Sequence, residues 1–176
     1  VCYNQINVSL NPNNCQVDVT PSFLLALPPQ TDTAFTINIV PQSGEDLGST
    51  IPAEYVGQTL TANITDNCSG LFCSTLISLI DVLPPTLNIP PDTTISCTST
   101  WEPETMGFAE GFDCTDVEVE YTDQFIEDDC GDPIAYVERT WTATDLSGNE
   151  TTATQTISIA RGTQQQMLFP QDVTYE

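Results

Sequence analysis

Alternation of apolar and polar residues is the feature that most constrains the fold of this chain. It recurs in five short stretches separated by turns rich in Asn, Pro and Gly: INVSL (6–10), CQVDV (15–19), FTINIV (35–40), TLTANIT (59–65) and STLISLI (74–80). Successive side chains of a β-strand point to opposite faces, so each stretch predicts a strand with one buried and one solvated face. Because no segment has a convincing helical period, we expect an all-β protein.

The Pro-Pro pair in DVLPPT (81–86) is the predicted domain boundary. An apolar strand ends there, two prolines stiffen the backbone, and a new alternating pattern begins. We therefore expect two tandem β-sandwich domains, residues 1–83 and 84–163. Residues 164–176 are expected to form a linker or strand that leads into a next module or a neighbouring subunit.

An internal repeat points to an array of such modules. LNIPPDTTIS (87–96) matches LFPQDVTYE (168–176) at its proline, aspartate and threonine positions, so the end of the chain reads like the start of another module. We expect this tail to contact an adjacent repeat or another copy of the chain. The apolar side chains predicted to make the contact are Met167, Leu168, Phe169, Val173 and Tyr175.

Charge excludes several classes of partner and of chemistry. The formal net charge is −23, with 25 acidic residues, Arg139 and Arg161 as the two basic residues, and no histidine. This field repels nucleic acids and anionic membranes, and no apolar run is long enough to insert into a bilayer. Without His or Lys there is no Ser-His or Ser-Lys nucleophile, no His metal ligand and no Schiff base. We predict a protein that is not an enzyme and requires no cofactor.

Seven cysteines predict an oxidising, extracellular environment. None has the paired spacing of a zinc site. Domains of about 80 residues bury only about 60 to 65% of their unfolded surface, and cross-links compensate for such small cores. An odd number leaves one cysteine for a bond outside this segment.

The second half contains a recognisable sequence motif. YTDQFIEDDCGDPIAYVERTWTATDLSGNETTATQTISI (121–159) resembles the hyalin-repeat (HYR)-like, immunoglobulin-like modules of large secreted Bacteroidota surface proteins, whose typical pattern is R-T-W-T-A-T-D-x-x-G-N-x-[ST]. Residues 2–25 and 55–87 are similar to the partner module of those proteins, while residues 26–53 match poorly. The resemblance implies two immunoglobulin-like β-sandwiches in a long adhesin or surface fibre at the cell surface.

The predicted disulfide pairs follow from the expected strands and turns of the two β-sandwiches. CSGLFC caps a predicted hairpin, which favours Cys68 with Cys73, and Cys2 with Cys15 follows by elimination. Strand directions in the second domain favour Cys97 with Cys130, because both would lie at one end of the sandwich. Cys114 is then the unpaired or intermolecular cysteine.

An acidic run and two tripeptides are further candidate sites. Glu127, Asp128, Asp129 and Asp132 form an oxygen-rich group of the kind that binds Ca²⁺, with a solvated acidic loop as the alternative. Thr33 and Thr93 lie in D-[ST]-[small or apolar] tripeptides, which resemble the O-glycosylation sequon of Bacteroidota. Ordinary turn polarity is the alternative there, and the glycoprotein prediction depends on these two sites.

The stretch ERTWTATDLSGN (138–149) is predicted to be structural. Alternation places Arg139 and Trp141 on one face, with Trp141 in the core between sheets and Arg139 in an ion pair. Asp145 and Gly148 are expected to form the turn between two strands, as a corner rather than a site.

These observations favour a structural repeat of an extracellular fibre or adhesin stalk, assembled end to end and cross-linked by disulfides. The alternative is an adhesive module that binds surface glycans or proteins. That alternative predicts exposed aromatic side chains at loop tips, for which Trp101, Tyr55 and Phe72 are the candidates.

Overall fold

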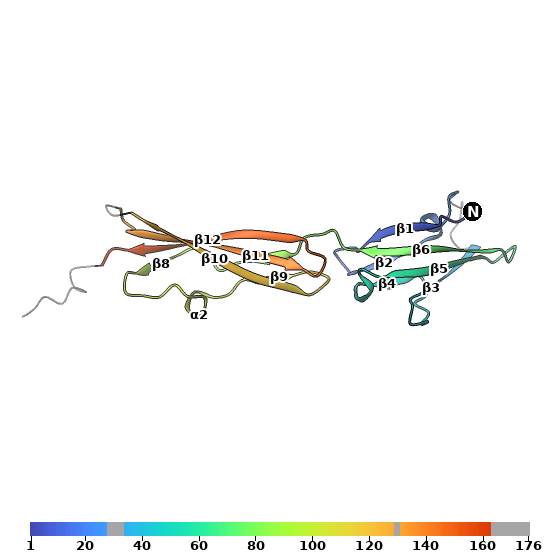
Figure 1. Ribbon diagram of the computed structural model, residues 1–176, viewed down its shortest axis with the longest axis horizontal. Helices are drawn as coiled ribbons and strands as arrows, with labels where there is room; N and C mark the ends of the chain where they lie inside the picture. Colours follow the sequence, from blue (N-terminus) through green and yellow to red (C-terminus); the bar gives the residue numbers. More distant parts are fainter. Residues whose placement is uncertain (28–33, 129–130, 163–176) are drawn as a thin grey trace, which may run out of the picture. The chain divides into compact units, whose positions relative to one another are not determined.

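The computed structural model describes residues 1–27, 34–128 and 131–162, and these are mostly β-strand (Figure 1). The fold is all-β with sandwich-like sheets, as the alternating pattern predicts. In the first half the elements are β1 (Gln5–Ser9), β2 (Gln16–Asp18), α1 (Pro21–Leu24), β3 (Phe35–Val40), β4 (Thr50–Pro52), the 3₁₀ turn η2 (Ala53–Tyr55), β5 (Thr59–Asp66) and β6 (Phe72–Ile80). In the second half they are β7 (Thr86–Asn88), β8 (Thr93–Ser96), α2 (Pro103–Met106), β9 (Glu110–Phe112), β10 (Val117–Glu127), β11 (Ala135–Asp145) and β12 (Glu150–Ala160).

The chain forms two compact units, and the first is assembled from three separate segments. It contains Val1–Pro85 together with two short return segments, Phe112–Val117 and Thr144–Asn149. The second unit contains the other described residues, from Thr86 onwards. The return segments therefore place residues from the second half of the sequence in the first unit.

The first unit packs a four-stranded sheet, in the order β1-β6-β5-β3, with a two-stranded sheet of β2 and β4. Alternate residues of β5 and β6 face the core, as period-2 patterning requires. The large apolar side chains that are fully buried in its core are Leu24, Ile39, Ile51, Leu60, Ile77 and Leu79.

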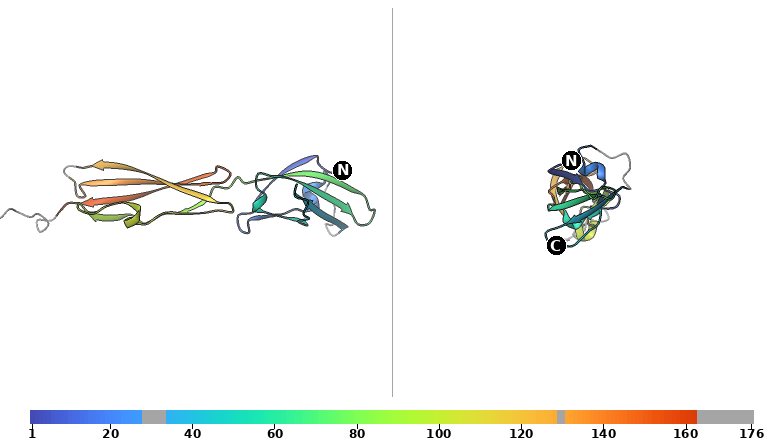
Figure 2. Two further views of the ribbon diagram at one scale, coloured as in Figure 1. Left: turned by 60° about the horizontal axis from the view of Figure 1, so that its bottom comes forward. Right: turned by 90° about the vertical axis from the view of Figure 1, so that its right-hand side faces the viewer.

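The second unit contains the sheet β10-β11-β12-β8 and the pair β7-β9 (Figure 2). Strand β11 buries every second residue from Ala135 to Asp145. This confirms the predicted face, on which Arg139 and Trp141 are 0% and 2% exposed. Ile95, Val137, Ile157 and Ile159 complete the apolar core.

In each unit the first strand of the main sheet pairs in parallel with the last. Strand β1 lies beside β6 with Gln5 opposite Leu76, and β8 lies beside β12 with Thr93 opposite Ile157. Parallel neighbours run in the same direction. The chain therefore enters each main sheet at one end and leaves it at the other.

Two disulfides cross-link the first unit, and both differ from the predicted pairs. Cys2 is bonded to Cys73 and Cys15 to Cys114, with Cα–Cα distances of 6.1 and 5.1 Å. The predictions of Cys68 with Cys73, Cys2 with Cys15, and an unpaired Cys114 are therefore wrong.

The pairing follows the strand order rather than proximity in sequence. Because β1 lies beside β6, Cys2 just before β1 meets Cys73 on β6. Cys114 belongs to a return segment and packs against the first core beside Cys15. Cys68 and Cys97 are exposed and have no disulfide partner among the described residues. Cys130 lies outside those residues, so its pairing with Cys97 stays a prediction.

We expect Cys114→Ser to lower the free energy of unfolding of the first unit by about 2 to 4 kcal/mol, because it opens the long loop from Cys15 to Cys114. Chemical denaturation of the oxidised protein measures this difference. Cys68→Ser is the matched control and should leave stability unchanged, since Cys68 is exposed and forms no disulfide within the part of the chain that the structure describes. Peptide mapping without reduction that recovers Cys2 linked to Cys15 would contradict the assignment.

Candidate functional sites: an acidic cluster and a buried arginine

The turn after β11 is organised around the carboxylate of Asp145. One carboxylate oxygen accepts the backbone N–H groups of Ser147 and Asn149 at 2.9 and 2.8 Å, and the other accepts the Asn149 side-chain amide at 2.8 Å. Gly148 has φ of +85°, which a glycine adopts without strain. The predicted turn between two strands is confirmed.

The same turn also brings Asp145 to two other carboxylates. The Asn149 amide donates a second hydrogen bond, 3.3 Å, to the backbone carbonyl of Asp81. Asp113, in a return segment, is the third member. One carboxylate oxygen from each of Asp81, Asp113 and Asp145 lies within 4.8 Å of the other two. This group is named the acidic cluster below, and all three residues belong to the first unit.

Each carboxylate of the acidic cluster has a different set of donors. Asp113 Oδ2 accepts both the backbone N–H and the hydroxyl of Thr115. Asp81 Oδ1 accepts the backbone N–H of Leu83 at 3.2 Å. Asp81 Oδ2 is buried and has no hydrogen-bond partner among the described residues, and Asp81 as a whole is 8% exposed.

Burial and charge act in opposite directions on Asp81 and Asp145. Burial raises the pKa of Asp81, and the negative charges of Asp113 and Asp145 raise it further against the opposing Leu83 hydrogen bond. Burial also acts to raise the pKa of Asp145, but hydrogen bonds from Asn149, Ser147 and Gly148 outweigh it and hold that pKa below its usual value. Asp145 is thus stabilised as an anion, whereas burial and the neighbouring negative charges disfavour ionisation of Asp81.

A groove borders the acidic cluster at Asp113. It has a volume of about 460 Å³ and is lined by Glu54, Asp113, Thr115, Asp116 and Leu146, with residues of η2 beside them. All of these residues lie in the first unit. Solvent and small ions therefore have a path to the Asp113 side of the acidic cluster.

The sequence-predicted Ca²⁺ group lies elsewhere. Of its members, Glu127, Asp128 and Asp132 are exposed, and the described carboxylates there do not gather within reach of one ion. Asp129 lies outside the described residues, so the full set stays a prediction. No local sequence pattern indicates the acidic cluster, because its three residues are far apart in the chain.

The other predicted sites are only partly described. Thr93 begins β8 and is half-buried. Thr33 and the tail residues Met167, Leu168, Phe169, Val173 and Tyr175 lie outside the described residues. Glycosylation and the tail contact stay predictions.

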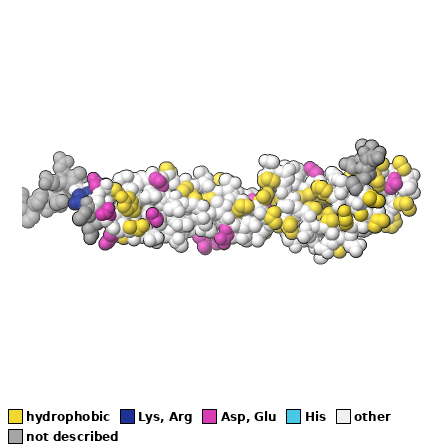
Figure 3. Space-filling model, turned by 90° about the horizontal axis from the view of Figure 1, so that it is seen from above, with side chains coloured by type: hydrophobic (Ala, Val, Ile, Leu, Met, Phe, Trp, Pro, Cys, Tyr) yellow, Lys and Arg dark blue, Asp and Glu magenta, His cyan; other side chains and the backbone are white. Residues whose placement is uncertain are grey.

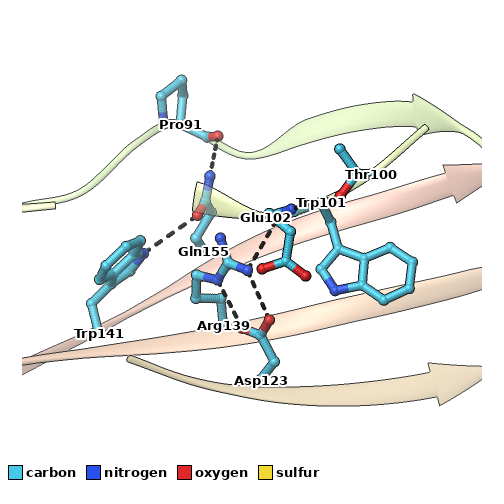
Figure 4. Close-up of polar contacts among 8 residues, drawn as sticks. All are labelled: Pro91, Thr100, Trp101, Glu102, Asp123, Arg139, Trp141 and Gln155. Atoms are coloured by element: carbon cyan, nitrogen blue, oxygen red, sulfur yellow. Dashed lines mark hydrogen bonds and ion pairs between the residues drawn. The ribbon is translucent and has the colours of Figure 1, made fainter. Parts of the chain in front are cut away.

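The second unit is centred on the buried guanidinium of Arg139 (Figure 4). Its Nε and Nη2 atoms donate to the two carboxylate oxygens of Asp123, each at 2.7 Å, and Nη2 also donates to the carbonyl of Trp101 at 3.0 Å. The guanidinium carbon lies 4.5 Å from the ring centroid of Tyr121. The hydrogen bonds to Asp123 raise the pKa of Arg139. The predicted ion pair is present, and it is internal rather than aimed at a ligand.

A chain of neutral hydrogen bonds lies next to this ion pair. Trp141 Nε1 donates to Gln155 Oε1 at 3.3 Å, and Gln155 Nε2 donates to the carbonyl of Pro91 at 3.2 Å. Gln155 and Trp141 are 0% and 2% exposed. These bonds satisfy the buried polar atoms of Trp141 and Gln155, and they join β11, β12 and the segment before β8. Nη1 of Arg139 is buried without a hydrogen-bond partner among the described residues.

Comparison with known proteins gives a distant structural likeness. No family model matches the chain, and no curated protein matches it. Among solved structures, a Drosophila N-cadherin EC1-3 structure is 15% identical, with a TM-score of 0.32 and 89% of this chain covered against 64% of that chain. Human protocadherin-24 EC1-2 is 13% identical, with a TM-score of 0.32 and 91% and 95% covered. The chain spans about half, 48%, of a Drosophila N-cadherin EC1-4 structure. None of the helices in the described ranges is long and apolar enough to cross a membrane.

We expect Asp123→Asn to destabilise the second unit by about 2 to 3 kcal/mol, because it leaves the buried Arg139 charge without its anion. Breaking a fully buried ion pair costs about 3 to 5 kcal/mol of stability. The loss expected here is smaller, because the Asp123 side chain is 25% exposed. Urea denaturation followed by Trp fluorescence measures the effect. Glu120→Gln, an exposed neighbour on β10, is the control. Equal stability of the two variants would mean that water replaces the carboxylate.

Proposed function

We propose that this chain is a non-catalytic structural segment of an extracellular surface fibre or adhesin stalk, built from β-sandwich units assembled end to end and cross-linked by disulfides. The observation that carries the proposal is the parallel pairing of first and last strands. Each main sheet receives the chain at one end and releases it at the other. A unit of this kind can be repeated in series without reversing the direction of the chain.

The disulfides and the chemistry of the described side chains support the same proposal. Disulfides such as Cys2–Cys73 and Cys15–Cys114 persist in oxidising environments outside the cytosol. Among the described residues, the one cation in the core is Arg139, which pairs with Asp123, donates to Trp101 and lies over the ring of Tyr121. A sequence without His or Lys has few means of acid–base or nucleophilic catalysis.

We expect cryo-electron microscopy of the native protein, kept oxidised and untrimmed, to show β-sandwich units following one another along a filament. The position of residues 164–176 is the decisive measurement. Density for the tail that continues into, or inserts within, a further unit supports the stalk. Discrete particles in which the tail folds back on its own unit would contradict it.

An exposed apolar row in the first unit favours an adhesive module as the second candidate. On β6, Phe72, Leu76 and Ile80 alternate with the buried residues and are 75%, 44% and 36% exposed, and Leu71 beside them is 74% exposed. Figure 3 shows hydrophobic side chains gathered on the surface of this unit. Phe72 is exposed, as predicted for an adhesive aromatic side chain. Trp101 is instead half-buried and stacks on Phe125 with ring centroids 5.8 Å apart.

If the first unit is adhesive, Phe72→Ser should weaken attachment of protein-coated beads to glycan- or protein-coated surfaces about tenfold or more, since anchoring aromatics dominate binding energy. Leu146→Ser is the control, because Leu146 is equally exposed, at 74%, but lies outside β6. Identical attachment of both variants and the parent chain would leave the stalk as the better account.

A further inference from the structure

We propose that the acidic cluster of Asp81, Asp113 and Asp145 is a calcium-binding site that fastens the two return segments to the body of the first unit. This inference does not depend on whether the chain is a stalk or an adhesive module. It concerns residues other than the sequence-predicted group at 127–132, and it rests on geometry, burial and the lack of a protein cation.

Geometry allows the three carboxylates to share one ion. Ca²⁺ binds oxygen at about 2.3 to 2.6 Å, so two oxygens on the same ion are at most about 5 Å apart. The three cluster oxygens lie within 4.8 Å of one another, which satisfies that limit for every pair. Water from the adjoining groove can complete a shell of six to eight ligands, as calcium sites commonly do.

One carboxylate of this group has an orphaned buried oxygen. Asp81 is 8% exposed, and its Oδ2 has no hydrogen-bond partner among the described residues. An isolated buried carboxylate oxygen carries a desolvation cost that either a cation or a proton removes. The neighbouring oxygens of Asp113 and Asp145 are acceptors, so they add to this cost as long as all three groups are ionised.

The chain itself supplies no cation here. Arg139 is engaged with Asp123 in the second unit, and Arg161 donates to the carbonyl of Gly131. The remaining partners of the cluster are neutral donors from Leu83, Thr115, Ser147 and Asn149. These donors hold the three carboxylates in place without neutralising them, and such preorganisation favours an external cation.

The donor set favours calcium over other metals. All three ligands are carboxylate oxygens, with no nitrogen or thiolate to select zinc or copper, and nearby Cys114 is already in a disulfide. Mg²⁺ requires near-ideal octahedral geometry at about 2.0 to 2.1 Å, whereas Ca²⁺ accepts irregular shells. Ligands on three separate segments form an irregular shell more readily than a regular one.

The ion would hold three segments that are distant in sequence. Asp81 follows β6, Asp113 lies in the return segment 112–117 and Asp145 in the return segment 144–149. The Cys15–Cys114 disulfide already ties the first return segment to the unit, and the Asn149 amide bonds the second one to Asp81. A bound calcium would link both to the end of β6 at one point.

The test is calcium binding by the oxidised chain, measured by isothermal titration in 150 mM NaCl after removal of divalent ions. We expect one site with a Kd of about 10⁻⁵ to 10⁻³ M, and a rise in the melting temperature of the first unit of about 5 to 10 °C at saturating calcium. Mg²⁺ at the same concentration should give a smaller shift.

Asp81→Asn and Asp113→Asn should each abolish the calcium-dependent shift, while Asp116→Asn, an exposed carboxylate in the same groove, should retain it. Absence of binding at 10 mM calcium, or a shift of equal size in Asp81→Asn, would overturn the proposal. Weak binding without a defined stoichiometry that survives in all variants would show only a diffuse ion atmosphere around a chain of charge −23, and would also overturn it.

A parallel measurement with chelator in place of calcium tests whether the Asp81→Asn variant is folded. Asp81 is buried beside two other carboxylates, so its charge costs stability when no cation is bound. With chelator at pH 7, Asp81→Asn should therefore melt at or above the parent chain. With calcium at pH 7 the order should reverse.

Discussion

The shortage of positive charge is the constraint on which this structure depends. Twenty-five acidic residues share two arginines, so most carboxylates must be satisfied by water, by neutral donors or by ions from solution. A recurrent solution is an aspartate that accepts the backbone N–H two residues later. Within the described ranges it occurs at five turns: Asp46 with Gly48, Asp66 with Cys68, Asp81 with Leu83, Asp113 with Thr115 and Asp145 with Ser147.

This aspartate turn also explains why carboxylates accumulate at one place in the first unit. An aspartate that closes a turn is fixed by its own backbone, so its position is set by where the turn lies and not by its charge. Three of the five turns meet at Asp81, Asp113 and Asp145. At Asp66 the hydrogen bonds from Ser69 and Cys68 lower the pKa. At Asp81 burial and two neighbouring anions have the opposite effect.

Local patterns predicted the strands well, and long-range pairings poorly. Alternation identified β3 at its full length and the buried face of β11, because side-chain direction in a strand repeats every two residues. The D-x-x-G-N corner was equally local. The disulfides join residues 71 and 99 positions apart, and the acidic cluster joins three turns, so both depend on strand order and on the return segments.

The parallel pairing of β1 with β6 has a mechanical consequence. If the two ends of the first unit are pulled apart, β1 and β6 must slide along each other, and all their hydrogen bonds from Gln5 opposite Leu76 to Ser9 opposite Ile80 are strained together. An antiparallel hairpin pulled from its open end would instead break one bond after another. Cys2–Cys73 bridges the two strands where β1 begins, so it limits this sliding covalently. The first unit thus resists extension through shear between β1 and β6, and the Cys2–Cys73 disulfide limits how far the two strands can slide.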